Sequence, residues 1–203
     1  MKPLYDYIIR PLGERYNNSV EVGDGKSLIL NTEIFNHGYI NRKAIVISTP
    51  IDNVHNLQEG QEIIVHHNIF RRWHNVKGIE KNSRGFLNEG EYLASPDQIY
   101  MYKNLTWECV NGFTFIKPLK NKDTFSLEPE QPLVGIVKYS DGKFLPTQLV
   151  GFRPSSEFEF VIDGERLYRV MNSFITMEYE YKGDEEEYNP SWAKSGRRAN
   201  QSS

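Results

Sequence analysis

The segment DYIIRPL at residues 6–12 returns in the second half of the chain as GFTFIKPL at residues 112–119. In each copy an apolar pair ending in isoleucine is followed by a basic residue, proline and leucine. Aromatic and β-branched residues favour extended backbone, and proline is tolerated where a strand ends, so each copy predicts a β-strand. The recurrence suggests that the chain contains two copies of one unit.

Three further segments of the first half have counterparts in the second half, in the same order. The pairs are 38–47 with 133–139, 63–66 with 149–152, and 92–103 with 168–179. In the last pair Met101 aligns with Met177. Short apolar runs, frequent turn signals and no convincing helical period predict an all-β chain of two small tandem β-barrels. The expected boundaries are 1–104 for the first barrel and 105–182 for the second.

Between these strands, residues 95–98 (SPDQ) predict either a turn or a single helical turn capped by Ser95, with Pro96 in its first position. The connection 69–91 is polar and contains three glycines, so we expect irregular structure there. Residues 183–203 open with an acidic run and end basic and polar, and this composition predicts a disordered tail.

Composition indicates a soluble protein of 203 residues with a formal charge of -3. A slightly acidic chain gives no electrostatic reason to expect nucleic acid as a partner. The single cysteine, Cys109, excludes an internal disulfide and fits a reducing compartment. No apolar stretch is long enough for a signal peptide or a membrane span, so we expect a cytoplasmic location without a membrane partner.

Residues 22–32 read VGDGKSLILNT, a glycine-rich run that leads into three consecutive large aliphatic residues. This pattern fits neither the alternation of a half-buried strand nor the spacing of a helix. One interpretation is a fully buried strand entered from a glycine turn. The other is a mobile loop that offers an aliphatic hook to an apolar groove of a partner and folds on binding.

The order of these features resembles the GroES-type co-chaperonin family. The matching segments of the first half are 7–11 (YIIRP), 28–30 (LIL), 43–46 (KAIV), 59–65 (EGQEIIV), 92–93 (YL) and 95–99 (SPDQI). In the second half, 157–168 (EFEFVIDGERLY) resembles the family's final hairpin, and 172–175 (NSFI) the turn after it. Plastid co-chaperonins are similarly doubled, and phage co-chaperonins are similarly divergent.

The chain departs from the family pattern at several places. The glycine of the family's Gly-x-Val strand is kept as Gly135 in the second half but is replaced by Arg42 or Lys43 in the first. The segment matching the family's roof hairpin is only 49–57, and the connection 69–91 is longer than expected.

The resemblance implies a co-chaperonin that caps a chaperonin ring in a nucleotide-dependent way and so assists protein folding. It also implies a homo-oligomeric ring, a GroEL-type chaperonin as partner, and neither catalysis nor a cofactor. The chaperonin-binding loop would be 17–34, and the residues expected to act in it are Gly25, Leu28, Ile29 and Leu30. The corresponding loop of the second half, 120–132, is shorter, and its candidate hooks are Phe125 and Leu127.

A different class of function fits the same features. A phage structural or assembly β-barrel protein would use the loop as an assembly arm and would have no chaperonin partner. An enzyme domain on a GroES-like barrel, as in alcohol dehydrogenases, would need a nucleotide-binding domain for which the sequence has no glycine pattern. With no P-loop or nucleophile elbow either, we do not expect an enzyme.

Two clusters carry weaker signals. His66 and His67 follow an apolar run, and because neighbouring strand residues point to opposite faces we expect no shared metal ion. The segment 71–73 (RRW), with basic residues up to Arg84, could touch nucleic acid, but a solvated loop or subunit contact is the favoured interpretation.

Overall fold

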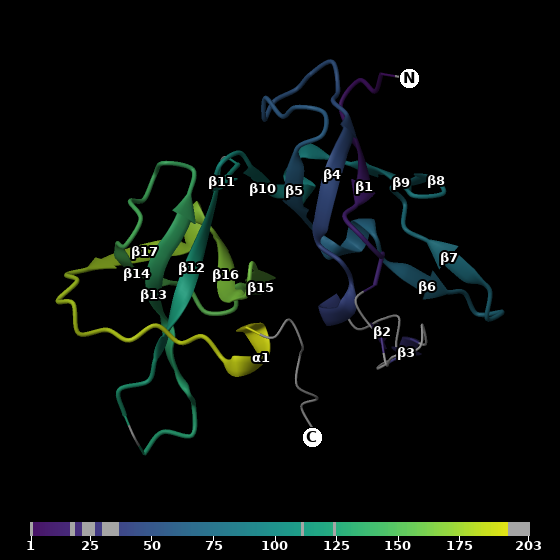
Figure 1. Ribbon diagram of the computed structural model, residues 1–203. Coiled ribbons are helices and arrows are strands. Elements are labelled where there is room, and N and C mark those ends of the chain that lie inside the picture. Colours follow the sequence, from purple (N-terminus) through teal and green to yellow (C-terminus); the bar gives the residue numbers. More distant parts are fainter. Residues whose placement is uncertain are drawn as a thin grey trace. The chain divides into compact units, whose positions relative to one another are not determined.

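The structure, a computed structural model, describes residues 2–16, 19–21, 27–29, 37–110, 112–123 and 125–194, and at 19–21, 27–29 and 37 only the backbone (Figure 1). The chain divides into two compact units, Met1–Trp107 and Glu108–Ser203. The predicted all-β class is confirmed, since the only α-helix among the described residues is the short α1, Ser191–Lys194. None of the helices in this part of the chain is long and apolar enough to cross a membrane.

The first unit is built on a seven-stranded sheet with the order β11-β10-β5-β4-β1-β9-β8. Its strands are β1 (Tyr7–Pro11), β4 (Lys43–Ser48), β5 (Glu62–Val65), β8 (Phe86–Asn88), β9 (Glu91–Ala94), β10 (Ile99–Lys103) and β11 (Trp107–Cys109). Two separate strand pairs are β2 (Ser19–Glu21) with β3 (Ser27–Ile29), and β6 (Arg72–His74) with β7 (Glu80–Asn82). The 3-10 turns are η1 (His37–Tyr39), η2 (His67–Ile69) and η3 (Pro96–Gln98).

The second unit is built on a six-stranded sheet with the order β15-β16-β12-β13-β14-β17. Its strands are β12 (Phe113–Lys120), β13 (Glu130–Ser140), β14 (Leu149–Phe152), β15 (Phe158–Ile162), β16 (Glu165–Met171) and β17 (Ile175–Tyr179), and its 3-10 turn is η4 (Asn172–Phe174). Strand pairing among the described residues does not close either large sheet into a barrel.

The two sheets have the same strand order. Read from its other edge, the second sheet runs β17-β14-β13-β12-β16-β15, which corresponds to β10-β5-β4-β1-β9-β8 in the first. A 3-10 turn joins the corresponding strands in each unit, η3 before β10 and η4 before β17. At η3 the backbone N–H of Gln98 donates to the Ser95 carbonyl at 3.0 Å, so of the two alternatives predicted for 95–98 the single helical turn is present, with Pro96 in its first position.

The register of the two sheets also corresponds. In the first unit Ile9 pairs with Tyr92 on one side and Val46 on the other. In the second unit Ile116 pairs in the same way with Tyr168 and Val137. The pairing shifts register directly after Ile8 in β1 and directly after Phe115 in β12. A second shift lies where β5 meets β10 and, in the other unit, where β14 meets β17. The agreement therefore extends to two irregularities of the sheets, whereas the shifts at Phe86–Asn88 and at Pro118–Lys120 have no counterpart in the other unit.

Burial follows the same correspondence. A core cluster of the second unit consists of Ile116, Val137, Val150, Phe152 and Val170. The residues at the corresponding positions of the first sheet are all buried as well: Ile9, Val46, Ile63, Val65 and Ala94. The same pattern of inward-facing positions thus supplies apolar burial in both units.

The register corrects one correspondence expected from sequence. Gly135 lies opposite Pro118, and the residue opposite Pro11 in the first unit is Ala44. The counterpart of the glycine is therefore Ala44 and not either of the basic residues at 42–43. In the same way, residues 149–152 of β14 correspond to residues 62–65 of β5, and not to residues 63–66 as expected from the sequence. Similarity between short apolar runs does not reveal register, because register depends on pairing between distant strands.

Two further segments are more ordered than expected. The connection 69–91 contains β6, β7 and β8, so the prediction of irregular structure there was wrong. In the expected tail, the backbone N–H of Lys120 donates to the Glu186 carbonyl and that of Tyr188 to the Pro118 carbonyl, both at 2.8 Å. Three ion pairs accompany these bonds: Lys117–Glu187, Lys120–Glu186 and Lys122–Asp184. Residues 184–188 thus run along β12, where lysines neutralise the acidic run; residues 195–203 lie outside the described part.

A polar network holds the start of β12. The Asp141 carboxylate accepts from the backbone N–H of Gly112 and from the Asn172 side chain, each at 2.8 Å. Asn172 in turn accepts from the buried Thr114 hydroxyl at 2.7 Å. Burial alone raises the pKa of Asp141, but the hydrogen bonds to its charged form outweigh burial and lower that pKa below the usual range.

We predict that Asp141→Asn destabilises the second unit by about 1–3 kcal/mol at pH 7, because charge-assisted hydrogen bonds are lost. A carboxylate with a lowered folded-state pKa stabilises above its unfolded pKa of about 4, and this contribution disappears as pH falls through the folded pKa. The difference between variant and parent should therefore shrink below pH 4. Urea unfolding at pH 7 and pH 3 measures it, with the exposed Asp97→Asn as control; a difference independent of pH would contradict the prediction.

We also predict that Gly135→Ala destabilises the second unit by about 1–3 kcal/mol through overpacking. A Cβ at this position would lie 2.4 Å from the Lys117 carbonyl oxygen and 2.5 Å from a methyl group of Ile116. The reciprocal Ala44→Gly creates no clash and should cost only about 0.5–1 kcal/mol. The midpoints of urea unfolding compare the two variants. An unchanged midpoint for Gly135→Ala would contradict the prediction, because it would mean that β12 and β13 accommodate the extra methyl group without loss of stability.

Candidate functional site

The residues predicted to bind a chaperonin lie on the connection between β1 and β4. Gly25 and Leu30 are outside the described residues. Leu28 and Ile29 belong to β3, which pairs antiparallel with β2, so that Leu28 lies opposite Val20. A short strand pair therefore lies within the predicted loop, and the role of its aliphatic residues stays a prediction.

The corresponding connection of the second unit joins β12 to β13 and carries the two other predicted hooks. Phe125 and Leu127 are 95% and 100% exposed. The backbone N–H of Asn121 donates to the Pro129 carbonyl at 3.0 Å, and the N–H of Phe125 donates to the Asp123 carboxylate at 2.9 Å. The loop is thus closed at its base and presents two unburied apolar side chains.

The histidines are arranged differently from the prediction. The rings of His66 and His67 are stacked with centroids 4.4 Å apart, instead of pointing to opposite faces. Strand alternation ends at Val65, and η2 begins at His67, with His66 Nδ1 accepting from the Asn68 N–H at 3.0 Å. Across the described residues no group of three or more His, Cys, Asp or Glu side chains could hold a metal ion.

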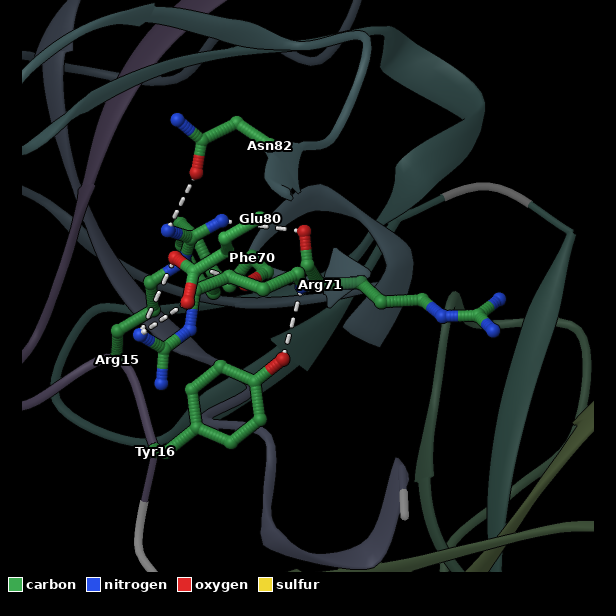
Figure 2. Close-up of polar contacts among 7 residues, drawn as sticks. Arg15, Tyr16, Phe70, Arg71, Glu80 and Asn82 are labelled. Atoms are coloured by element: carbon green, nitrogen blue, oxygen red, sulfur yellow. Dashed lines mark hydrogen bonds and ion pairs between the residues drawn. The ribbon is translucent and has the colours of Figure 1, made fainter. Parts of the chain in front are cut away.

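The β6–β7 hairpin is fastened to the rest of the first unit by Arg15, as Figure 2 shows. Its Nε donates to the Phe70 carbonyl at 2.6 Å and its Nη2 to the Arg71 carbonyl at 3.1 Å. Its Nη1 donates to the Asn82 side chain at 2.7 Å, and the guanidinium lies 5.2 Å from the centre of the Tyr92 ring. Burial lowers the pKa of Arg15, but arginine stays charged at neutral pH. One cation thus binds the residues that lead into β6 and the last residue of β7.

Tyr16 supplies a second anchor beside it. Its hydroxyl accepts from the backbone N–H of Arg72 at 2.8 Å, and the Arg72 guanidinium lies 4.6 Å from the centre of its ring. The same guanidinium is paired with Glu80 at 3.4 Å. Tyr16 itself is buried and forms a β-bridge with Ile40. The hairpin therefore rests on two neighbouring residues that directly follow the β1 region.

The pairing of the hairpin separates its side chains into two faces. Arg72 lies opposite Asn82, and Trp73 lies opposite Lys81. Because successive strand residues point to opposite sides, Arg72, Glu80 and Asn82 share the face toward Arg15. Trp73 and Lys81 share the other face.

A pocket of about 540 Å³ adjoins this other face. Its lining includes Asn68, Ile69, Arg71, Trp73, Arg84 and Gln98. The lining contains two arginines and no acidic residue. The Arg71 side chain extends away from the other residues drawn in Figure 2. The pocket therefore combines positive charge, one large aromatic ring and side-chain amides.

Gly85 brings the end of the hairpin close to β9 at this pocket. The backbone N–H of Leu93 donates to the Gly85 carbonyl at 2.6 Å, and a Cβ on Gly85 would lie 2.4 Å from the Leu93 oxygen. Both residues line the pocket. Only glycine permits this approach, because any Cβ at position 85 would clash with the Leu93 oxygen. The shape of this pocket wall therefore requires glycine at position 85.

The second unit has a polar cluster with a different character. Arg166 is paired with Glu130 and, at 2.8 Å, with Glu159, and it donates to the Tyr168 hydroxyl at 2.6 Å. The Tyr168 hydroxyl donates to Glu130, and burial, together with this acceptor, raises the pKa of Tyr168. The four side chains satisfy one another, which is the behaviour of a structural network rather than of a site awaiting a ligand.

Comparison with models of protein families, with curated proteins and with solved structures gives no match for this chain. Its functional assignment therefore rests on its own residues and their geometry.

Sequence reasoning missed Arg15 and Tyr16, because their partners are backbone groups on residues about fifty positions away, such as Phe70. It did single out the basic and aromatic segment 71–73 and Arg84. What it could not show is which of these side chains face the pocket.

We predict that Arg15→Ala releases the hairpin without unfolding the first unit. Loss of its charged hydrogen bonds should lower the opening free energy of residues 70–85 by about 2 kcal/mol, and amide hydrogen exchange there should become at least about tenfold faster. Hydrogen exchange followed by mass spectrometry measures this. Arg10→Ala, which removes an exposed ion pair with Glu91, is the control; equal exchange in both variants would contradict the role of Arg15.

Proposed function

We propose that this chain is a co-chaperonin that caps a chaperonin ring in a nucleotide-dependent way through apolar residues on its loops. The observation that carries the proposal is the position of those residues. The triplet 28–30 and the exposed pair Phe125 and Leu127 belong to the connections between corresponding strands, β1 to β4 and β12 to β13. The apolar residues of the two proposed loops thus belong to the same connection of a shared strand order.

The proposal includes two tandem GroES-like β-barrels. It is supported by the shared strand order, the shared register and the two shared register shifts. The matching sets of buried residues support it as well. A common ancestor of the two units accounts for all four correspondences, whereas similar composition accounts for none of the shifts.

The physics of such binding favours many weak contacts. Burial of three aliphatic side chains gives about 1.5–3 kcal/mol each, and ordering of a loop costs about 1–2 kcal/mol per residue. One loop alone therefore binds weakly. A homo-oligomeric ring that offers several loops at once binds tightly through effective concentration, and it can still be released when the chaperonin changes shape.

We predict that the purified protein co-sediments with a bacterial chaperonin only in the presence of nucleotide. Ile29→Ser should abolish this binding, and the double variant Phe125→Ser with Leu127→Ser should weaken it if the second loop takes part. The control is Leu105→Ser, because Leu105 is also 100% exposed but lies outside both loops.

Size-exclusion chromatography checks that each variant keeps the oligomeric state of the parent protein. Absence of binding under every nucleotide condition, with the cognate host chaperonin tested, would overturn the proposal in favour of an assembly or structural role. Binding that Ile29→Ser leaves intact would overturn the assignment of the first loop.

A further inference from the structure

We propose that the pocket beside the β6–β7 hairpin binds a nucleotide unit, with Trp73 stacking on the base and with Arg71 and Arg84 holding the phosphate. The ligand is defined by its chemistry, a phosphate joined to a flat aromatic base. It could come from a free nucleotide or from one position of a single-stranded nucleic acid. This inference does not depend on the co-chaperonin proposal.

The distribution of charge over the hairpin is the first argument. Between residues 71 and 84 the sequence has five basic residues and a single acidic one, Glu80. Glu80 lies on the face toward Arg15 and is paired there with Arg72. The single acidic residue of this segment therefore lies on the face away from the pocket.

The state of the arginines is the second argument. Arg15 and Arg72 are engaged by carbonyl oxygens, an amide, a carboxylate and aromatic rings that hold the hairpin. Within the described residues Arg84 makes no hydrogen bond or ion pair, although it lines the pocket. A guanidinium presents a planar set of donors that matches a phosphate group. Arg84 is thus available for an anion that enters the pocket.

Trp73 supplies the aromatic platform. Its side chain is 43% exposed although its size and apolar character favour burial. Every base has a π-face, and stacking on an exposed aromatic side chain is a common mode of nucleotide and single-strand recognition. The amides of Asn68 and Gln98, which also line the pocket, can read the polar edge of a base.

The pocket is also formed in advance and has a suitable size. Its volume of about 540 Å³ lies within the usual range for small-molecule sites, about 300–1,000 Å³. Arg15, Tyr16 and the close approach at Gly85 fix its walls. In the second unit the connection between β14 and β15 spans only residues 153–157, so the shared framework does not require this hairpin.

The formal charge of -3 led us to expect no nucleic-acid partner. Net charge describes the whole chain, whereas a ligand responds to the potential at its own site. The acidic run near the end of the chain is paired with Lys117 and Lys120 of β12 and with Lys122 after it, far along the sequence from the hairpin. The local composition of the pocket is therefore the better guide.

The test is fluorescence anisotropy with a fluorescein-labelled ten-residue oligothymidylate, with competition by thymidine monophosphate and by inorganic phosphate. We expect saturable binding that weakens at least about fivefold in Trp73→Ala and less in Trp73→Phe, which keeps a ring. Arg84→Gln should weaken binding and reduce the slope of log affinity against log salt by about 0.7 for the lost phosphate contact. The matched control is Arg153→Gln, which removes one charge from an exposed position in the second unit.

The competitors distinguish the sources. Displacement by the mononucleotide at a concentration similar to that of the unlabelled oligomer identifies a free-nucleotide site, and displacement by the oligomer alone identifies a single-strand site. Three results would overturn the proposal: no binding of either probe, inorganic phosphate competing as well as the mononucleotide, or binding unchanged in Trp73→Ala and Arg84→Gln. Thermal unfolding checks that each variant folds. If Trp73→Ala does not fold, Trp73→Phe and Arg84→Gln still test the proposal.

Discussion

In each unit one interior strand carries a register shift in its pairing with the strand that follows it in the framework, β1 with β4 in the first unit and β12 with β13 in the second. Side chains of a strand alternate between faces, so a shift of one residue in its pairing moves residues to the other face. The shifts after Ile8 and after Phe115 therefore decide which residues are buried beyond them. With the shift in the same place, both units bury residues at the same five core positions.

The β6–β7 hairpin follows a different rule. The side chains of β7 are all exposed, so burial of apolar surface contributes little to its stability. It is held by the Arg15 guanidinium and the Tyr16 hydroxyl, which bind backbone groups of residues 70–72 on the β6 side of the hairpin base. On the β7 side Arg15 binds the Asn82 side chain. The exposed face of the hairpin therefore carries charged and aromatic residues that the core does not need for its packing.

The fold could be predicted from the sequence as far as local patterns reach. Apolar runs and turns located most strands, and the Asp163-Gly164 turn, with both residues at positive φ, suits the hairpin of β15 and β16. The register of the strands could not be predicted from local patterns, because it depends on pairing between residues of different strands, such as Gly135 with Pro118. The β6–β7 hairpin was not predicted, because the contacts that hold it join Arg15 to carbonyl groups more than fifty residues away. The order of the acidic run was not predicted either, because its lysine partners are more than sixty residues away. The pocket residues were noticed, but their common face follows only from the pairing.

The proposed loop and the proposed pocket share an anchor. The loop is closed at its base where Tyr16 forms a bridge with Ile40 and where the Asn41 N–H donates to the Arg15 carbonyl at 3.1 Å. The side chains of Arg15 and Tyr16 hold the hairpin beside the pocket. A change that displaces either residue therefore alters the attachment of the loop and the shape of the pocket together. Coupling through shared residues is reciprocal, so a ligand that stabilises the hairpin would also restrain the base of the loop.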